Sequence, residues 1–270
     1  MMYSPEGLLL LPYQIENRSQ CEICLPMFNG DFRDWSDVGY HCTPANITWT
    51  RNRWGQAPYF NGTDSYILDP AGRKILREGT TGNWSLVKFG GDIKVIGEGT
   101  QLFINNGSTL PPALTGQFSS DWADNIPNLR RLAFQLNSFS GSFPTYEWPD
   151  LEQLLCNSNS LSGHFLAYSW PNLTSLYCQF NSFTSFDFSD FSGTSCAALS
   201  ARGNSMNQAA VSDVVDDLYP IRAILGGNTC DIKLQDNAIP TADAIAKIEG
   251  TGVYVGDGLK DHGCTVSYDT

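Results

Sequence analysis

The feature that most constrains this chain is a repeat in its second half. Segments that begin at Pro127, Pro149 and Pro171 align without gaps, so successive copies are 22 residues apart. Two further copies follow after 23 and 33 residues, counted from asparagine to asparagine, and an early half-copy precedes the series at residues 114–118. A unit of this length cannot bury a hydrophobic face alone. The period therefore predicts units that stack against one another.

Each copy follows the template L-x-x-L-x-L-x-x-N-x-L. The L-x-L alternation predicts a short strand with one face directed inward. The asparagine is expected to turn inward and bond to backbone groups that the following turn leaves unsatisfied. Cys156 and Cys178 stand where the template has leucine, which predicts small buried hydrophobes rather than a metal or redox pair. The structural asparagines are Asn137, Asn159, Asn181, Asn204 and Asn237.

This template closely resembles the leucine-rich repeat, and the tail after each asparagine is similar to that of the plant type. The resemblance implies a solenoid in which a second short strand lies on the flank. In the fourth and fifth units, apolar spacing over residues 207–218 and 241–249 predicts helices instead. Residues 204–266 look like a terminal module of leucine-rich-repeat proteins from phages and bacterial surfaces, although Cys264 stands where that module tends to carry tryptophan.

The first hundred residues are expected to be rich in β-structure. Residues 46–69 are similar to the opening of laminin-G and concanavalin-like sandwiches, and residues 85–105 alternate in the manner of strands joined by glycine turns. We therefore expect a mainly β fold. Residues 111–270 would form a leucine-rich-repeat solenoid with short helices at its C-terminal end, and residues 1–110 a β-rich N-terminal cap or docking domain.

Charge and hydropathy exclude several classes of partner. The chain has 16 Lys and Arg against 28 Asp and Glu, and its net charge of −12 repels phosphate backbones, so we expect no nucleic acid partner. No segment approaches the roughly 20 apolar residues of a membrane span, so we expect no membrane insertion. We also find no export signal and expect most of the eight cysteines to be free thiols.

One cysteine cluster leaves alternatives open. Cys21 and Cys24 form a C-x-x-C pair, and His41 and Cys42 follow. Zinc coordination and a disulfide are both alternatives, but the second pair is adjacent, which strains tetrahedral coordination by both residues. We expect unpaired cysteines here, and neither a metal nor a cofactor in the protein.

No catalytic constellation is visible in the sequence. The chain has three histidines, and none lies in a nucleophile or metalloprotease motif. Glycoside hydrolysis would need two converging carboxylates, which a sequence cannot reveal. We therefore expect a protein that is not an enzyme and that acts through its surface.

The outward positions of the predicted strands form the candidate binding face, because extended concave faces of repeat proteins commonly bind partners. The alternative is an ordinary solvated β-face. The candidate residues are Arg131, Gln135, Gln153, Asn157, Tyr177, Gln179, Arg202 and Lys233.

Together these features favour a non-enzymatic virion structural or adhesion protein, such as a phage tail-fibre, tail-associated or capsid-decoration component. It would be assembled in the host cytoplasm and would bind other virion proteins or a host surface protein or glycan. The alternative is a bacterial surface or secreted recognition protein, and a more remote one is a carbohydrate-active enzyme. The sequence leaves open whether the chain forms homo-oligomers.

Overall fold

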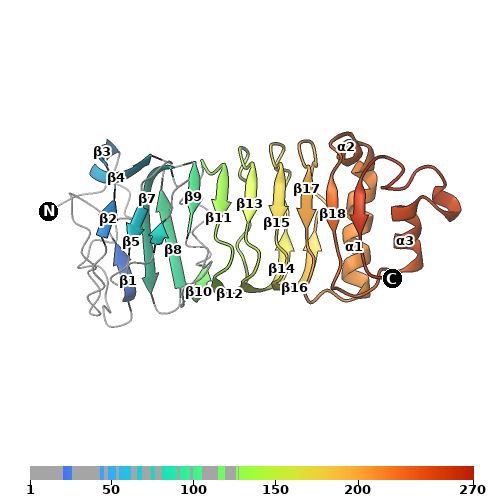
Figure 1. Ribbon diagram of the computed structural model, residues 1–270, viewed down its shortest axis with the longest axis horizontal. Helices are drawn as coiled ribbons and strands as arrows, with labels where there is room; N and C mark the ends of the chain where they lie inside the picture. The colour runs from blue at the N-terminus through green and yellow to red at the C-terminus, as the bar shows by residue number, and fades with distance from the viewer. Residues whose placement is uncertain are drawn as a thin grey trace.

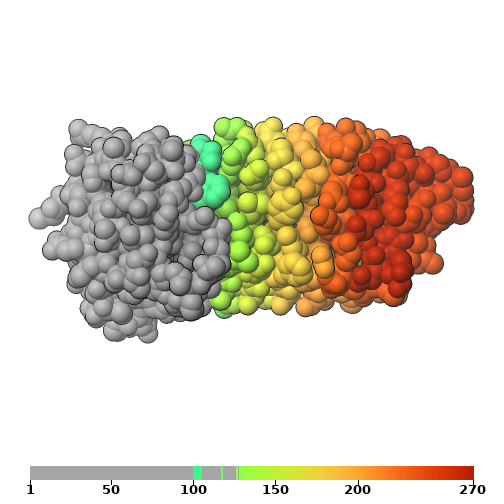
Figure 2. Space-filling view, in the orientation of Figure 1, coloured from blue at the N-terminus to red at the C-terminus, as the bar shows by residue number. Residues whose placement is uncertain are grey.

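The computed structural model describes residues 100–104, 117, 126 and 128–270 with their side chains. It also describes, by backbone pairing alone, the strands at residues 21–25, 43–45, 48–52, 55–61, 66–68, 74–76, 81–89, 92–97 and 115–118. The units of the second half follow one another in chain order along the longest axis of the molecule (Figure 1, Figure 2).

Seven three-residue strands pair side by side in parallel, and we call them the main ladder. They are β9 (Gln101–Phe103), β11 (Arg131–Ala133), β13 (Gln153–Leu155), β15 (Ser175–Tyr177), β17 (Ala198–Ser200), β18 (Asp231–Lys233) and β19 (Thr265–Ser267). The central residue of each strand is paired with the central residue of the next and is buried. Leu132, Leu154, Leu176, Leu199 and Ile232 therefore stack in consecutive units, and the register expected from the repeat is confirmed.

A second parallel series lies on the flank of the units, and we call it the flank ladder. It consists of β8 (Asp92–Gly97), β10 (Thr115–Phe118), β12 (Ser138–Gly141), β14 (Ser160–Leu166) and β16 (Ser182–Asp187). The expected flank strand is thus present, but its register differs from the sequence alignment. Ser140 pairs with Ser160 and Ser162 with Ser182, an interval of 20 residues instead of 22. A shift of two residues keeps the same side chains inward, because the side-chain period of a strand is two.

Aromatic side chains fill the core beneath the main ladder. Phe134, Phe165 and Phe183 are fully buried, and the ring centroids of Phe165 and Phe183 lie 5.4 Å apart. Two buried tryptophans also recur at the repeat interval. The indole N–H of Trp148 donates to the Ile126 carbonyl at 3.1 Å, and that of Trp170 donates to the Tyr146 carbonyl at 2.8 Å. Each unit thus buries a large ring and satisfies its polar atom.

Helices replace the flank strand in the last units. They are α1 (Gln208–Leu218), η3 (Tyr219–Ile221), α2 (Arg222–Gly227), α3 (Ala242–Glu249) and η4 (Gly252–Tyr254). The Asn207 side chain caps α1 by accepting from the Ala210 N–H, and Thr241 caps α3 in the same way. Gly250 ends α3 in the left-handed conformation, with φ at 66°. Both helices expected from the sequence are confirmed, whereas α2 was not expected.

The N-terminal strands are mostly antiparallel. Strand β7 pairs with β1, β4 and β8, and β3 pairs with β4, while β2, β5 and β6 form a separate three-stranded sheet. Their bounds are Cys21–Leu25 (β1), Thr43–Ala45 (β2), Thr48–Asn52 (β3), Gly55–Asn61 (β4), Tyr66–Leu68 (β5), Lys74–Leu76 (β6) and Thr81–Phe89 (β7). The strands expected between residues 85 and 105 are confirmed. Because β9 pairs with β11 and β8 with β10, strand pairing continues across residue 110.

The expected fold class, a mainly β leucine-rich-repeat solenoid, was wrong. The structure is α/β-like, with a mostly parallel main ladder of seven strands, a separate sheet of three strands, and short helices in the later units. The physical reason lies in how little of each unit the template specifies. A unit gives only three residues to a main-ladder strand, and from Asn207 onward helices supply the apolar side chains that close the core. Val211, Val214 and Leu218 on α1 are buried in this way.

Candidate functional site

The outward residues of the main ladder form columns that run across the strands, and all eight candidate residues lie in them. Each strand directs its first and third residues outward, and a third column follows two positions after each strand. Arg131 and Gln153 lie in the first column, Tyr177 and Lys233 in the second, and Gln135, Asn157, Gln179 and Arg202 in the third. The structure therefore brings the predicted residues onto one face.

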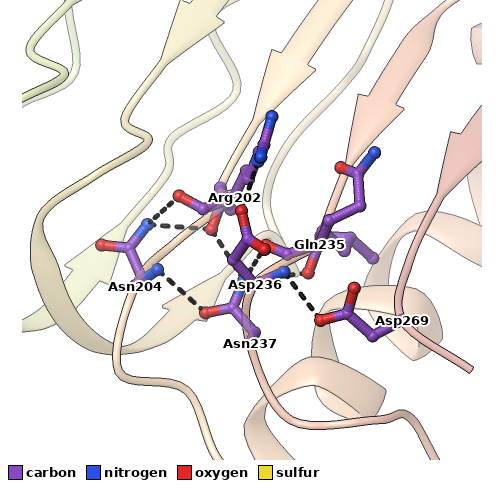
Figure 3. A network of polar contacts seen from close by, with 8 residues as sticks. Arg202, Asn204, Gln235, Asp236, Asn237 and Asp269 are labelled. Carbon is purple, nitrogen blue, oxygen red and sulfur yellow. Dashed lines mark hydrogen bonds and ion pairs between the residues drawn. The ribbon is translucent and has the colours of Figure 1, made fainter.

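Each cation on this face is paired with a carboxylate. The Arg131 Nε lies 3.2 Å from a Glu152 oxygen, and the Lys233 Nζ lies 2.9 Å from an oxygen of Asp231. The Arg202 Nε lies 2.6 Å from an oxygen of Asp236, as Figure 3 shows. Exposed pairs of this kind contribute only about 0–1 kcal/mol to stability. Their effect on binding is larger, because no candidate cation of the face is left without a counter-charge.

A fourth column lies at the turn that follows each strand, and its residues have left-handed backbone. The φ angles are 58° at Leu136, 57° at Ser158, 57° at Phe180, 60° at Gly203 and 58° at Asp236. This conformation is unfavourable for bulky residues. It recurs because the turn must bring the next residue, the structural asparagine, into the interior. Leu136 is nevertheless 43% exposed and Phe180 47%.

Sequence reasoning missed Leu136 and Phe180. Both occupy an unspecified position of the template, and the alternation of a strand does not extend into the turn. A signal was present, because an apolar residue stands directly between a glutamine and the structural asparagine in two units. Only the backbone geometry shows that such a residue is directed into solvent.

The structural asparagines bind two units together. The Asn181 Nδ2 donates to the carbonyls of Cys156 and Cys178, each at 3.1 Å, and to that of Gln179 at 3.4 Å. Its Oδ1 accepts from the Leu161 N–H at 3.1 Å. Asn159, Asn204 and Asn237 likewise bond to carbonyls of their own and the preceding unit, and Asn137 bonds to Phe134 and Gln135.

An aspartate ends the turn series at the last unit. In earlier units the turn N–H donates to a backbone carbonyl of the next unit, as Phe180 does to Arg202 at 2.9 Å. The Asp236 N–H instead donates to the Asp269 carboxylate at 2.8 Å (Figure 3). A side-chain oxygen thus replaces the missing carbonyl.

The third column contains unsatisfied acceptors. The Oε1 atoms of Gln135, Gln179 and Gln235 are buried and have no hydrogen-bond partner among the described residues. Such an atom costs about 1–3 kcal/mol of desolvation. Three equivalent positions share this property, so it belongs to the repeated geometry of the column.

A separate polar cluster surrounds Asp257 near the last helices. Its carboxylate accepts two bonds from Arg222, at 2.9 and 2.6 Å, and one from the Tyr219 hydroxyl at 2.9 Å. The His262 Nε2 lies 2.9 Å from the same carboxylate. Arg222, then His262 and Tyr219, hold the pKa of Asp257 well below its ordinary value. In the described part of the chain His262 bonds to no serine or cysteine, so the cluster lacks a nucleophile and its role is to join α2 to the last loop.

Five cysteines are described, and all are buried free thiols. The Cys156 and Cys178 sulfurs lie 3.3 Å apart, and burial raises the pKa of Cys178 well above its ordinary value. Burial also raises the pKa of Cys264 to about 11. These thiols are therefore poor nucleophiles at neutral pH.

The alternatives considered for Cys21, Cys24, His41 and Cys42 lie outside the residues whose side chains are described. Within the described residues, no group of three or more metal-ligating side chains is placed to hold an ion.

Comparisons with known proteins place no family beside this face. The sequence matches no protein-family model, and a search of curated proteins finds no match either. Among the described residues, no helix has the length and apolar character needed to cross a bilayer.

Proposed function

We propose that this protein is a non-enzymatic structural or attachment component of a virus particle and that it engages its partner through the outward face of the main ladder. The observation that carries the proposal is the continuity of this face. Side chains from consecutive strands repeat in aligned columns, and the cations among the candidate residues are already paired with carboxylates. Extended faces of this kind suit the recognition of an extended partner surface.

Two further points support the virion assignment. The chemistry of the described residues offers no nucleophile with an adjacent base, which favours binding over catalysis. The resemblances of residues 46–69 and 204–266 point to surface and phage proteins. A polar surface with few charges, 16% of residues, also suits a particle component better than a partner of nucleic acid.

The test has two parts. Mass spectrometry of purified particles from the source should detect the chain, and its absence there would contradict the virion assignment. Changing Tyr177→Ala together with Arg131→Ala should weaken attachment or assembly while the melting temperature stays nearly unaltered, because outward surface changes usually stay within about 0.5 kcal/mol.

Tyr146→Ala is the matched control, since Tyr146 is an exposed tyrosine, 38% accessible, outside the main ladder. It should leave attachment intact. If attachment survives the double change but fails when the surface of residues 1–110 is altered, the N-terminal region is the docking element and the proposal for the main ladder is wrong. Glycan turnover that a single Asp or Glu change abolishes would overturn the non-enzymatic assignment.

A further inference from the structure

One part of the main-ladder face is uncharged apart from a single paired arginine. In the units of β11, β13 and β15, the outward strand and turn positions carry amides, hydroxyls, aliphatic groups and aromatic rings. Arg131 is the exception, and it pairs with Glu152 at the edge where the strands begin. The next pairs, Arg202 with Asp236 and Lys233 with Asp231, belong to the following units. The members of this strip are Arg131, Ala133, Gln135, Leu136, Gln153, Leu155, Asn157, Ser158, Ser175, Tyr177, Gln179 and Phe180.

Two aromatic rings stand on one unit of the strip. Tyr177 ends β15, and Phe180 lies in the turn three residues later, with Gln179 beside it. The Phe180 ring leans on the next unit, because a Cβ added at Gly203 would lie 2.7 Å from the Phe180 Cδ1. The Arg202 guanidinium carbon lies 5.3 Å from the same ring centroid. The ring is therefore held in place by its neighbours while nearly half of it stays exposed.

Unused amide groups run between the apolar side chains. The Oε1 atoms of Gln135 and Gln179 are buried without a partner, and in the described structure neither side chain makes a hydrogen bond. Their Nε2 groups thus remain available as donors to a ligand. Asn157 lies between the two glutamines and bonds only to the adjacent Ser158 hydroxyl in the same described region, at 3.2 Å. The column therefore offers amides at three successive strands.

The size of the strip limits the kind of partner. Strands lie about 4.8 Å apart and rise about 3.3 Å per residue, so three strands and their turns span roughly 15 Å by 15 Å. That is a few hundred Å², well below the about 800 Å² that each partner of a standard protein interface buries. A chain-like ligand fits this strip better than a globular partner.

We propose that the strip binds a linear, uncharged glycan that runs along the main ladder and crosses its strands. The inference rests on the proposed function of this face and adds the class of ligand. Planar amides both donate to and accept from sugar hydroxyls. The rings of Tyr177 and Phe180 provide apolar contact for the C–H faces of sugar rings. An acidic glycan finds no free cation here, because Arg131 and Arg202 are already paired.

The experiment measures binding of the full chain to defined oligosaccharides by calorimetry. The uncharged probes are cellohexaose, chitohexaose, xylohexaose and maltohexaose, and the acidic probes are hyaluronan hexasaccharide and a galacturonate oligomer. At least one uncharged probe should bind, and both acidic probes should bind about tenfold more weakly or not at all. Affinity for the uncharged probe should be nearly independent of salt, since no ion pair forms.

Variants identify the surface that binds. Phe180→Asn, which keeps a residue that tolerates left-handed backbone, and Gln179→Leu should each weaken binding about tenfold. Ile224→Ser is the matched control. Ile224 is 45% exposed, close to Phe180 at 47%, and lies on α2, which precedes β18 and so is remote from the turn end of the strands.

Three results would overturn the inference: no uncharged probe binds at millimolar concentration, an acidic probe binds as tightly, or Phe180→Asn binds like the unaltered chain. The proposed function fails separately. If attachment depends on Tyr177 and Arg131 but neither periodate treatment of the target nor free oligosaccharide inhibits it, the face binds a protein. In that case the glycan inference falls and the proposed function stands.

Discussion

Replacing Asn181 by alanine tests how the units are joined. The side chain is buried and makes four hydrogen bonds, three through Nδ2 and one through Oδ1. Its carbonyl acceptors are not all lost with it. The Cys156 carbonyl also accepts from Asn159, and the Cys178 carbonyl also accepts from Asn204.

The magnitude follows from the group that loses its partner. The Leu161 N–H is buried, and its bond to the Asn181 Oδ1 has no substitute from a neighbouring asparagine. An orphaned buried donor costs about 1–3 kcal/mol, and weaker satisfaction of the shared carbonyls adds about 1 kcal/mol. We therefore expect Asn181→Ala to lower the free energy of unfolding by about 2–4 kcal/mol.

The assay is urea denaturation followed by circular dichroism, with Asn157→Ala as the control. Asn157 is one strand earlier, faces outward and bonds to Ser158 alone among the described residues, so its loss should cost less than about 0.5 kcal/mol. Equal midpoints for the two variants would refute the reasoning. Asn181→Leu, which fills the same space without polar atoms, should be as destabilising as alanine if the hydrogen bonds, and not the volume, are responsible.

Three shorter predictions concern the core, pH and thiols. Leu154→Ala should lower the free energy of unfolding by about 2–5 kcal/mol through the cavity it leaves, whereas Leu155→Ala, the outward neighbour on the same strand, should cost much less by the same denaturation assay. Because the folded pKa of Asp257 lies below its unfolded value, this carboxylate stabilises the fold above about pH 4 and the benefit is lost as pH falls further. Asp257→Asn should therefore flatten the acid side of a melting-temperature profile, and an unchanged profile would contradict the role of its Arg222 bonds. A thiol reagent should react with most of the 8 cysteines in denaturant, while Cys264 and the other four buried cysteines should stay unreactive in the native protein; a count near zero in denaturant would show that the cysteines are oxidised.

The main-ladder register could be predicted because it depends on side chains with a single possible environment. Leu154 must be buried, and Asn181 must satisfy backbone groups, so both recur at the unit interval and mark it. The caps of α1 and α3 were predictable for the same reason, since Asn207 and Thr241 bond to the first turn of their helices. Local chemistry specified these features almost completely.

The fold class was not predictable from the same pattern. The template places three residues of each unit in a strand and does not specify the rest, so later units form α1, α2 and α3 where earlier ones form flank strands. The stagger of the flank ladder was also hidden, because Ser140 and Ser160 are offset from the sequence alignment by two residues. Register between strands depends on how the connecting segments pack, and this is a long-range property.

Binding residues are harder to predict than core residues because outward positions do little for stability, and Phe180 shows the consequence. Its φ of 57° is unfavourable for a bulky side chain, and the ring is largely exposed, so the residue costs stability without burying much apolar surface. Asparagine tolerates this backbone better, so Phe180→Asn should raise the free energy of unfolding by about 0.5–1 kcal/mol, less whatever the Arg202 contact contributes. The same change should weaken ligand binding, as expected when strain is retained for function. A variant that is destabilised and still binds would show instead that Phe180 is there to hold the units together.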